Sequence, residues 1–260
     1  MAVPVLQPRA NGPAERFANL VGARRPVAVF IAALLCGFAA LAGASLLLGL
    51  FVTDVLLHAG GVESTDESAI TSLVADRTPF LTDASSVGSA VGGAPVLPIL
   101  VGLIAIVCAF LRKWRIAAFA VFVLVVESAS YRVTSWLIPR QRPHVQRLED
   151  LPANASYPSG HTAASIAVYA GLVLLLTSAI PNRKLRVAAW VAAVVLPIFV
   201  AMSRMYRGMH HPLDVAAGAL IGVGAVLVLL FACRAAAAAV REPAASRSPV
   251  ARRRRVQAAS

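Results

Sequence analysis

The sequence predicts an all-α membrane protein, a polytopic bundle of about six transmembrane helices. Of its 260 residues, 58% are hydrophobic and only 14% are charged, and the mean hydropathy is +0.75. A water-soluble domain of this length could not bury so much apolar side chain. A helix needs about 20 apolar residues to cross a hydrocarbon core roughly 30 Å thick. Six apolar stretches are close to this length: 26–52, 95–111, 115–138, 161–180, 186–202 and 212–233.

Basic residues gather at alternate ends of these stretches, and this pattern predicts the orientation. Four segments carry most of them: 1–25, 112–115 (RKWR), 181–186 (PNRKLR) and 251–255 (ARRRR). Short cytoplasmic segments of membrane proteins are enriched in Lys and Arg. We therefore expect a multi-pass protein of the cell membrane with both termini in the cytoplasm. The net charge of +12 is explained in this way and does not indicate a nucleic-acid partner.

One membrane domain, residues 26–233, accounts for most of the chain. Residues 1–25 and 234–260 are predicted to be cytoplasmic tails without regular structure, and the second of them is basic. The first apolar stretch is too long for the hydrophobic region of a cleaved signal peptide, so it is expected to remain as an anchor.

The acidic segment 53–94 is predicted to be an extracytoplasmic loop. Within it, Ile70, Leu73 and Val74 have helical spacing. This spacing predicts a short amphipathic helix within residues 66–86 that lies on the outer surface.

Three polar clusters fall at the predicted outer ends of the last four helices. They are IPRQRPHVQR at 138–147, YPSGH at 157–161 and SRMYRGMHHPLD at 203–214. Basic residues are unusual on the translocated side of short loops, so their presence there points to function. Guanidinium groups and helix N-terminal N–H groups bind tetrahedral anions such as phosphate. Two histidines can supply a nucleophile and a proton donor near neutral pH.

His210 and Asp214 are four residues apart, which places them on one helical face if a helix begins there. A carboxylate bonded to one imidazole nitrogen fixes the tautomer and makes the other nitrogen a better nucleophile. His211 departs from this spacing and is interpreted as a bystander. The sequence has no acidic cluster suited to Mg²⁺ and no complete Zn²⁺ ligand set, so we expect phosphoryl transfer without a metal or cofactor, with arginines stabilising the charge.

These residues resemble the type 2 phosphatidic acid phosphatase superfamily, whose fold also occurs in vanadium haloperoxidases. Its motifs are Lys-x6-Arg-Pro, Pro-Ser-Gly-His and Ser-Arg-x5-His-x3-Asp. The second is complete at Pro158-Ser159-Gly160-His161, and the third is complete at Ser203, Arg204, His210 and Asp214. The first is half present, because Arg142-Pro143 fits but Ser135 stands at the lysine position. The resemblance covers roughly residues 95–233, with the active site in 135–214.

The resemblance implies a role for each matched residue. His210 attacks phosphorus to form a phosphohistidine, Asp214 orients His210, and His161 protonates the leaving oxygen and then activates water. The groups implied to hold the phosphate oxygens are Arg142, Ser159, Gly160 and Arg204. Arg132 and Arg140 are both candidates to replace the missing lysine, which makes Arg140 a further candidate substrate-binding residue.

The sequence thus predicts a membrane lipid phosphatase that hydrolyses a lipid phosphomonoester or diphosphate at the outer leaflet of the cell envelope. The resemblance implies phosphatidate, phosphatidylglycerophosphate or polyprenyl diphosphates as substrates. Two alternatives stay open: a phosphotransferase using the same phosphohistidine, and a non-catalytic protein that binds lipid phosphates at a degenerate site. The motifs specify neither the substrate nor the oligomeric state.

Overall fold

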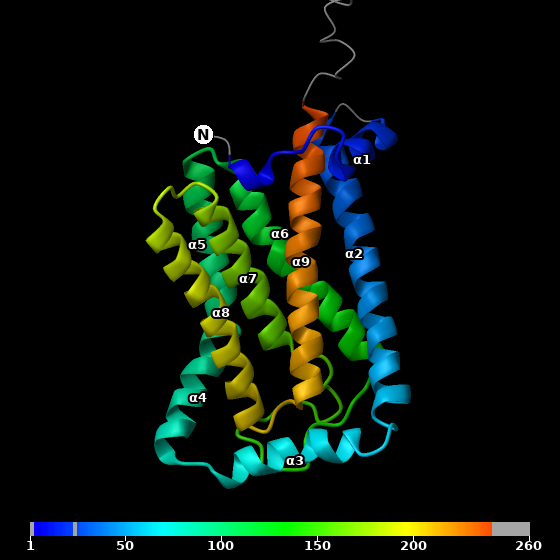
Figure 1. The fold of residues 1–260 in the computed structure, drawn as a ribbon, viewed down its shortest axis with the longest axis vertical. Coiled ribbons are helices and arrows are strands. Elements are labelled where there is room, and N and C mark those ends of the chain that lie inside the picture. Colours follow the sequence, from blue (N-terminus) through cyan, green and yellow to red (C-terminus); the bar gives the residue numbers. More distant parts are fainter. Residues whose placement is uncertain (1–2, 23–24, 241–260) are drawn as a thin grey trace, which may run out of the picture.

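The computed structural model describes residues 3–22 and 25–240 and shows a bundle of long helices with a shorter helix across one end (Figure 1). Its described part contains no β-strand. Six helical stretches there are long and apolar enough to cross a membrane: Pro26–Leu56, Pro79–Phe110, Trp114–Leu137, Gly160–Thr177, Arg183–Tyr206 and Pro212–Ala239. The predicted all-α membrane bundle is therefore confirmed. The basic run 251–255 lies outside the described residues.

The first two membrane stretches are each composite, and the other four are single helices. The helices of the bundle are α2 (Pro26–Leu50) with the π-helix η2 (Phe51–Leu56), α4 (Pro79–Val91) with α5 (Val96–Phe110), α6 (Trp114–Leu137), α7 (Gly160–Thr177), α8 (Arg183–Tyr206) and α9 (Pro212–Ala239). The helix across the end is α3 (Val62–Ala75). The site is built at this end of the bundle, which we call the α3 end.

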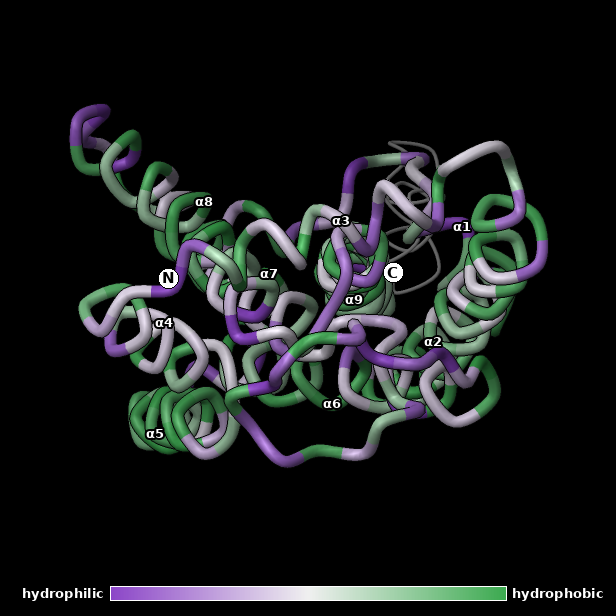
Figure 2. Tube along the Cα trace, turned by 90° about the horizontal axis from the view of Figure 1, so that it is seen from below, coloured by the Kyte–Doolittle hydropathy of each residue, from purple (hydrophilic) through white to green (hydrophobic). Residues whose placement is uncertain are grey.

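Helix α9 lies near the middle of the bundle, with α2, α6 and α7 packed against it (Figure 2). Small residues on α9 let α7 approach closely, as is common between membrane helices. A Cβ added at Gly218 would collide with the carbonyl oxygen of Ser159, and one at Gly222 would collide with that of Ala163. This close packing brings the start of α7 beside the start of α9. The second and third motifs therefore meet.

Helix α4 occupies residues that the sequence analysis placed in the predicted loop 53–94. Its serines and glycines lower the hydropathy of the segment, and this concealed a helix continuous with the second membrane stretch. The same small residues allow tight packing on α8: a Cβ at Gly88 would collide with Ser203 Oγ, and one at Gly92 would collide with the Val200 side chain. The predicted amphipathic helix is α3, which ends at Ala75 and begins at Val62, four residues before the predicted segment.

The N-terminal segment contains regular structure, whereas the sequence predicts a tail without it. Helix α1 (Pro13–Val21) packs on α9, and Phe17 meets Phe231 edge to face with ring centroids 5.4 Å apart. Residues Pro4–Leu6 form a 3₁₀ turn, and the Val5 carbonyl accepts a hydrogen bond of 2.8 Å from Arg234 Nε. Helix α1 therefore lies at the opposite end of the bundle from α3 (Figure 1).

Candidate active site

The three polar clusters come together at the α3 end of the bundle. The second motif starts α7, and the third runs from the end of α8 through a short loop into α9. The first cluster lies in the loop 138–159 between α6 and α7. Hydrogen bonds to main-chain carbonyls join them: Ser159 N donates to the Asp214 carbonyl at 2.9 Å, and the side-chain Nη1 of Arg142 donates to the Met209 carbonyl at 2.5 Å.

His210 is held in a single tautomer by a main-chain carbonyl. Its Nδ1 lies 2.6 Å from the carbonyl oxygen of Ser156, and the side chain is almost fully buried. Because a carbonyl oxygen can only accept, Nδ1 carries the proton and Nε2 keeps its lone pair. Burial lowers the pKa of His210 well below its usual value, and the charge of Arg204 lowers it further. The geometry therefore presents an uncharged imidazole with a free nucleophilic nitrogen.

Asp214 supports this arrangement indirectly. Its carboxylate lies 3.9 Å from His210 Nδ1, beyond hydrogen-bonding distance, so the expected direct bond is absent. Instead it accepts hydrogen bonds from Ser156 Oγ at 2.5 Å and from the main-chain N–H of His211 at 2.8 Å. Ser156 thus connects Asp214 to His210. Sequence reasoning missed Ser156 because it lies outside the motif and acts on His210 through its main chain.

Arg140, which the sequence predicts to be a substrate-binding residue, forms ion pairs with two carboxylates. Its Nη1 donates to Asp214 at 2.5 Å and its Nη2 donates to Asp66 of α3 at 2.6 Å. Burial alone would lower the pKa of Arg140, but the charges of Asp214 and Asp66 raise it overall. Arg132 is exposed on α6.

His211 links the start of α9 to α3 through two carboxylates. Its Nδ1 lies 3.2 Å from Asp214 Oδ2 and its Nε2 lies 2.9 Å from Glu67 Oε2 of α3. Burial lowers the pKa of His211, but the hydrogen bond and charge of Asp214, with a further bond to Glu67, raise it overall. Together with the Arg140–Asp66 pair, this bond fixes α3 against the start of α9.

Arg204 is fully buried and only partly satisfied. Its Nη1 donates to Ser89 Oγ at 2.6 Å and to the Glu149 carboxylate at 2.7 Å, but its Nε and Nη2 have no partner among the described residues. A buried donor left without a partner costs about 1–3 kcal/mol. The orphan N–H groups of Arg204 therefore favour binding of an anion.

Arg142 adds a second buried positive charge. Its Nε donates to the Pro152 carbonyl at 2.9 Å. Burial lowers the pKa of Arg142, and repulsion from Arg204 lowers it further. Both arginines act electrostatically on His161 as well as on His210. The two histidines therefore lie in one positively charged site. An anion bound between them would relieve the repulsion between Arg142 and Arg204.

The remaining motif residues shape the start of α7. Ser159 is its buried N-cap residue and shares a hydrogen bond of 3.0 Å with Thr162. A Cβ at Gly160 would lie 3.0 Å from the ring of Tyr131, so glycine lets the helix approach α6 closely. His161 is half-buried at the helix start. These residues form the part of the site that lies against Tyr131 of α6 and against Gly93 in the link between α4 and α5.

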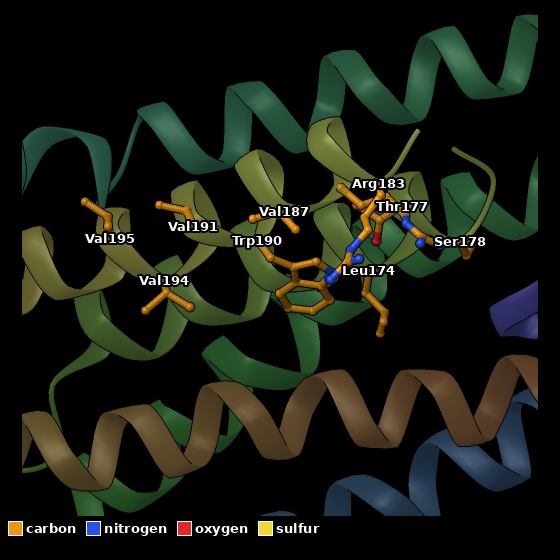
Figure 3. A pocket seen from close by; sticks show the side chains of 10 residues that line it. Leu174, Thr177, Ser178, Arg183, Val187, Trp190, Val191, Val194 and Val195 are labelled. Carbon is orange, nitrogen blue, oxygen red and sulfur yellow. The ribbon is translucent and has the colours of Figure 1, made fainter. Parts of the chain in front are cut away.

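A groove of about 720 Å³ between α7 and α8 lies at the other end of the bundle. Figure 3 shows Trp190 and a row of α8 valines along it, with Arg183 at one end. It contains none of the motif residues, so it is separate from the candidate active site.

The structure thus combines six membrane-length helical stretches with a buried cluster of arginines and histidines at one end of the bundle. In the comparison with known proteins, residues 115–237 match the PAP2 superfamily. The chain is a multi-pass membrane phosphoric ester hydrolase.

Several of the similar proteins are named as phosphatases. Phosphatidylglycerophosphatase B of Bacillus subtilis is 27% identical over 69% of this chain and 88% of its own length. Undecaprenyl-diphosphatase of Sulfolobus acidocaldarius is 33% identical over 45% of this chain and 55% of its own length. The crystal structure of a transmembrane PAP2 type phosphatidylglycerolphosphate phosphatase from Bacillus subtilis, 25% identical, superposes with a TM-score of 0.61 and covers 80% of this chain and 94% of that one.

Proposed function

We propose that this protein removes phosphate from a lipid phosphomonoester or diphosphate by transferring it first to His210 and then to water. The proposal rests on one observation: an imidazole of fixed tautomer occurs in the same site as arginine N–H groups that have no hydrogen-bond partner among the described residues. The Ser156 carbonyl holds the proton on Nδ1 of His210, and Arg204 offers two buried N–H groups without partners. Such a site gives an anionic phosphoryl group a nucleophile and charge stabilisation together.

The reaction would proceed in two steps. His210 Nε2 attacks phosphorus while the bond from phosphorus to the leaving oxygen breaks, and His161 gives that oxygen its proton. His161 then takes a proton from water, which attacks the phosphohistidine and releases inorganic phosphate. Arg142 and Arg204 would stabilise the charge on the transferred oxygens in both steps. Asp214 would act by positioning Ser156 and His211.

The position of the site at one end of the bundle suits a lipid substrate. The headgroup of the lipid could reach the α3 end while the lipid's apolar chains stay in the bilayer. The names of the relatives include a glycerophospholipid phosphate and a polyprenyl diphosphate, and both are lipids with a terminal phosphate. The basic links 112–115 and 181–186 lie at the opposite end, which favours an outer-leaflet site and cytoplasmic termini.

Phosphate release from a lipid panel tests this proposal. The panel holds phosphatidate, phosphatidylglycerophosphate and a polyprenyl diphosphate, with purified protein in detergent and EDTA. We expect release by the wild type, loss of it in His210→Ala, and wild-type rates in the control His144→Ala, whose side chain is 83% exposed. Consumption of lipid without free phosphate would indicate a phosphotransferase. Tight lipid binding without turnover would indicate a non-catalytic protein.

A further inference from the structure

A second cluster of anion-binding groups adjoins the candidate active site and already holds an anion, the carboxylate of Glu149. Arg204 Nη1 lies 2.7 Å from Glu149 Oε2, and Arg207 Nε lies 2.7 Å from Glu149 Oε1. Ser89 Oγ of α4 donates to Oε1 at 2.9 Å. Neither Ser89, Glu149 nor Arg207 belongs to the motifs of the sequence analysis.

The guanidinium group of Arg204 has two edges with different surroundings. Its Nη1 points to Ser89 and Glu149, whereas its Nε and Nη2 are buried without a partner in the described structure. The orphan side suits the phosphoryl group that His210 attacks. The Nη1 side, together with Arg207, suits a second anionic group attached to the first.

The second cluster lies on the side of His161, which would protonate the leaving group. The link that follows α4 reaches both His161 and Ser89, because a Cβ at Gly93 would lie 2.5 Å from His161 Nε2 and 3.2 Å from the carbonyl oxygen of Ser89. Glu149 and Arg204 are among the charges that act on His161. An anion in place of the Glu149 carboxylate would therefore sit next to the leaving oxygen.

Glu149 can leave this position without movement of the backbone. Its side chain is 24% exposed, and it lies in the loop 138–159, outside any helix. The loop itself stays attached to Arg207, since Leu148 N donates to the Arg207 carbonyl at 3.1 Å. Rotation of the Glu149 side chain alone would free the Arg204 and Arg207 donors.

We propose that Ser89, Arg207 and the Nη1 side of Arg204 form a second anion subsite, which Glu149 fills until a substrate with a charged leaving group displaces it. This rests on the proposed phosphatase function and favours lipid diphosphates over lipid monophosphates. His210 attacks the terminal phosphorus and the bond to the bridging oxygen breaks. The lipid monophosphate leaves with the proton of His161, and water then releases inorganic phosphate from His210.

The first test compares two substrates with the same prenyl chain, the diphosphate and the monophosphate. We expect Arg207→Gln to lower the ratio of kcat/KM for diphosphate to that for monophosphate by about tenfold or more, as loss of a charge-assisted bond predicts. The control Arg147→Gln, in the same loop, keeps the wild-type ratio. We expect Glu149→Gln to lower KM for the diphosphate. An unchanged ratio in Arg207→Gln, or a raised KM in Glu149→Gln, overturns the subsite.

A binding measurement separates this proposal from the proposed function. Thermal unfolding of the detergent-solubilised protein is followed with inorganic pyrophosphate and with inorganic phosphate, neither of which requires lipid turnover. The subsite predicts a larger stabilisation by pyrophosphate that is lost in Arg207→Gln and kept in Arg147→Gln. Equal stabilisation by the two anions contradicts the subsite even if lipid phosphates are hydrolysed. Absence of lipid hydrolysis with selective pyrophosphate binding contradicts only the phosphatase proposal.

Discussion

At the scale of single residues, the site depends on buried polar groups whose partners come from distant parts of the chain. Asp214 accepts hydrogen bonds from Ser156, His211 and Arg140, and it is fully buried. A buried carboxylate is tolerated only when its oxygens are satisfied in this way. The side chains that carry chemistry could be predicted because they recur at fixed spacing. Their supports could not, because Ser156 acts through a carbonyl and Glu149 lies between motifs.

The protonation of His210 gives a prediction at this scale. Burial and the charges of Arg204 and Arg142 lower its pKa well below 6.5, so it stays neutral throughout the neutral range. Proton uptake then favours the unfolded chain as pH drops below 6.5, and this histidine weakens folding stability in acid. We expect the ¹³C NMR resonance of His210, assigned with His210→Ala, to show no titration near pH 6.5. A midpoint between pH 6 and 7 would refute this electrostatic account of the site.

At the scale of elements, α4 is a membrane helix that hydropathy does not identify, because close packing requires small residues in it. Gly88 of α4 and Gly92 at its C-cap lie against α8, and small residues reduce the apolar signal that identifies a span. The long apolar helices were predictable from hydropathy because their residues face lipid. Helix α1 was missed for a different reason: it is short, and its apolar face is recognised only once α9 is present to cover it.

The packing of α4 on α8 predicts that a larger side chain at Gly88 is harmful. Gly88→Leu forces the helices apart at Ser203, and overpacking of this kind typically costs about 1–3 kcal/mol. Thermal unfolding in detergent should therefore occur at a lower temperature, and activity should fall because Ser89 moves away from Arg204. Gly102→Leu is the matched control, since nothing lies within 4 Å of a Cβ at that position. Equal behaviour of the two variants would argue against tight α4–α8 packing.

At the scale of the whole molecule, composition predicted the bundle, and alternating charge predicts its orientation. The α3 end carries the acidic helix and the site, whereas the links RKWR and PNRKLR lie at the other end. The central position of α9 could not be predicted from the sequence, because it depends on which helices contact one another. Glycines permit these contacts, but a glycine in the sequence does not indicate which helix packs against it.

Orientation is tested by cysteine labelling in intact cells. In a background with the native cysteines replaced by alanine, a membrane-impermeant maleimide should label Asp150→Cys, which is exposed at the α3 end. Lys113→Cys, exposed at the opposite end, should react only after the cells are permeabilised. The reverse pattern would place the site in the cytoplasm and contradict the positive-inside assignment.

The measurement that bears most directly on the account is capture of the phosphoenzyme. Wild-type protein and His210→Asn are mixed with a lipid phosphate carrying a radioactive terminal phosphate and quenched with alkali within one turnover. Phosphoryl transfer through His210 predicts label on the peptide that contains His210, stable in alkali and lost in acid, and none in His210→Asn. Product formation without labelled protein, or equal label in the variant, would contradict phosphoryl transfer through His210.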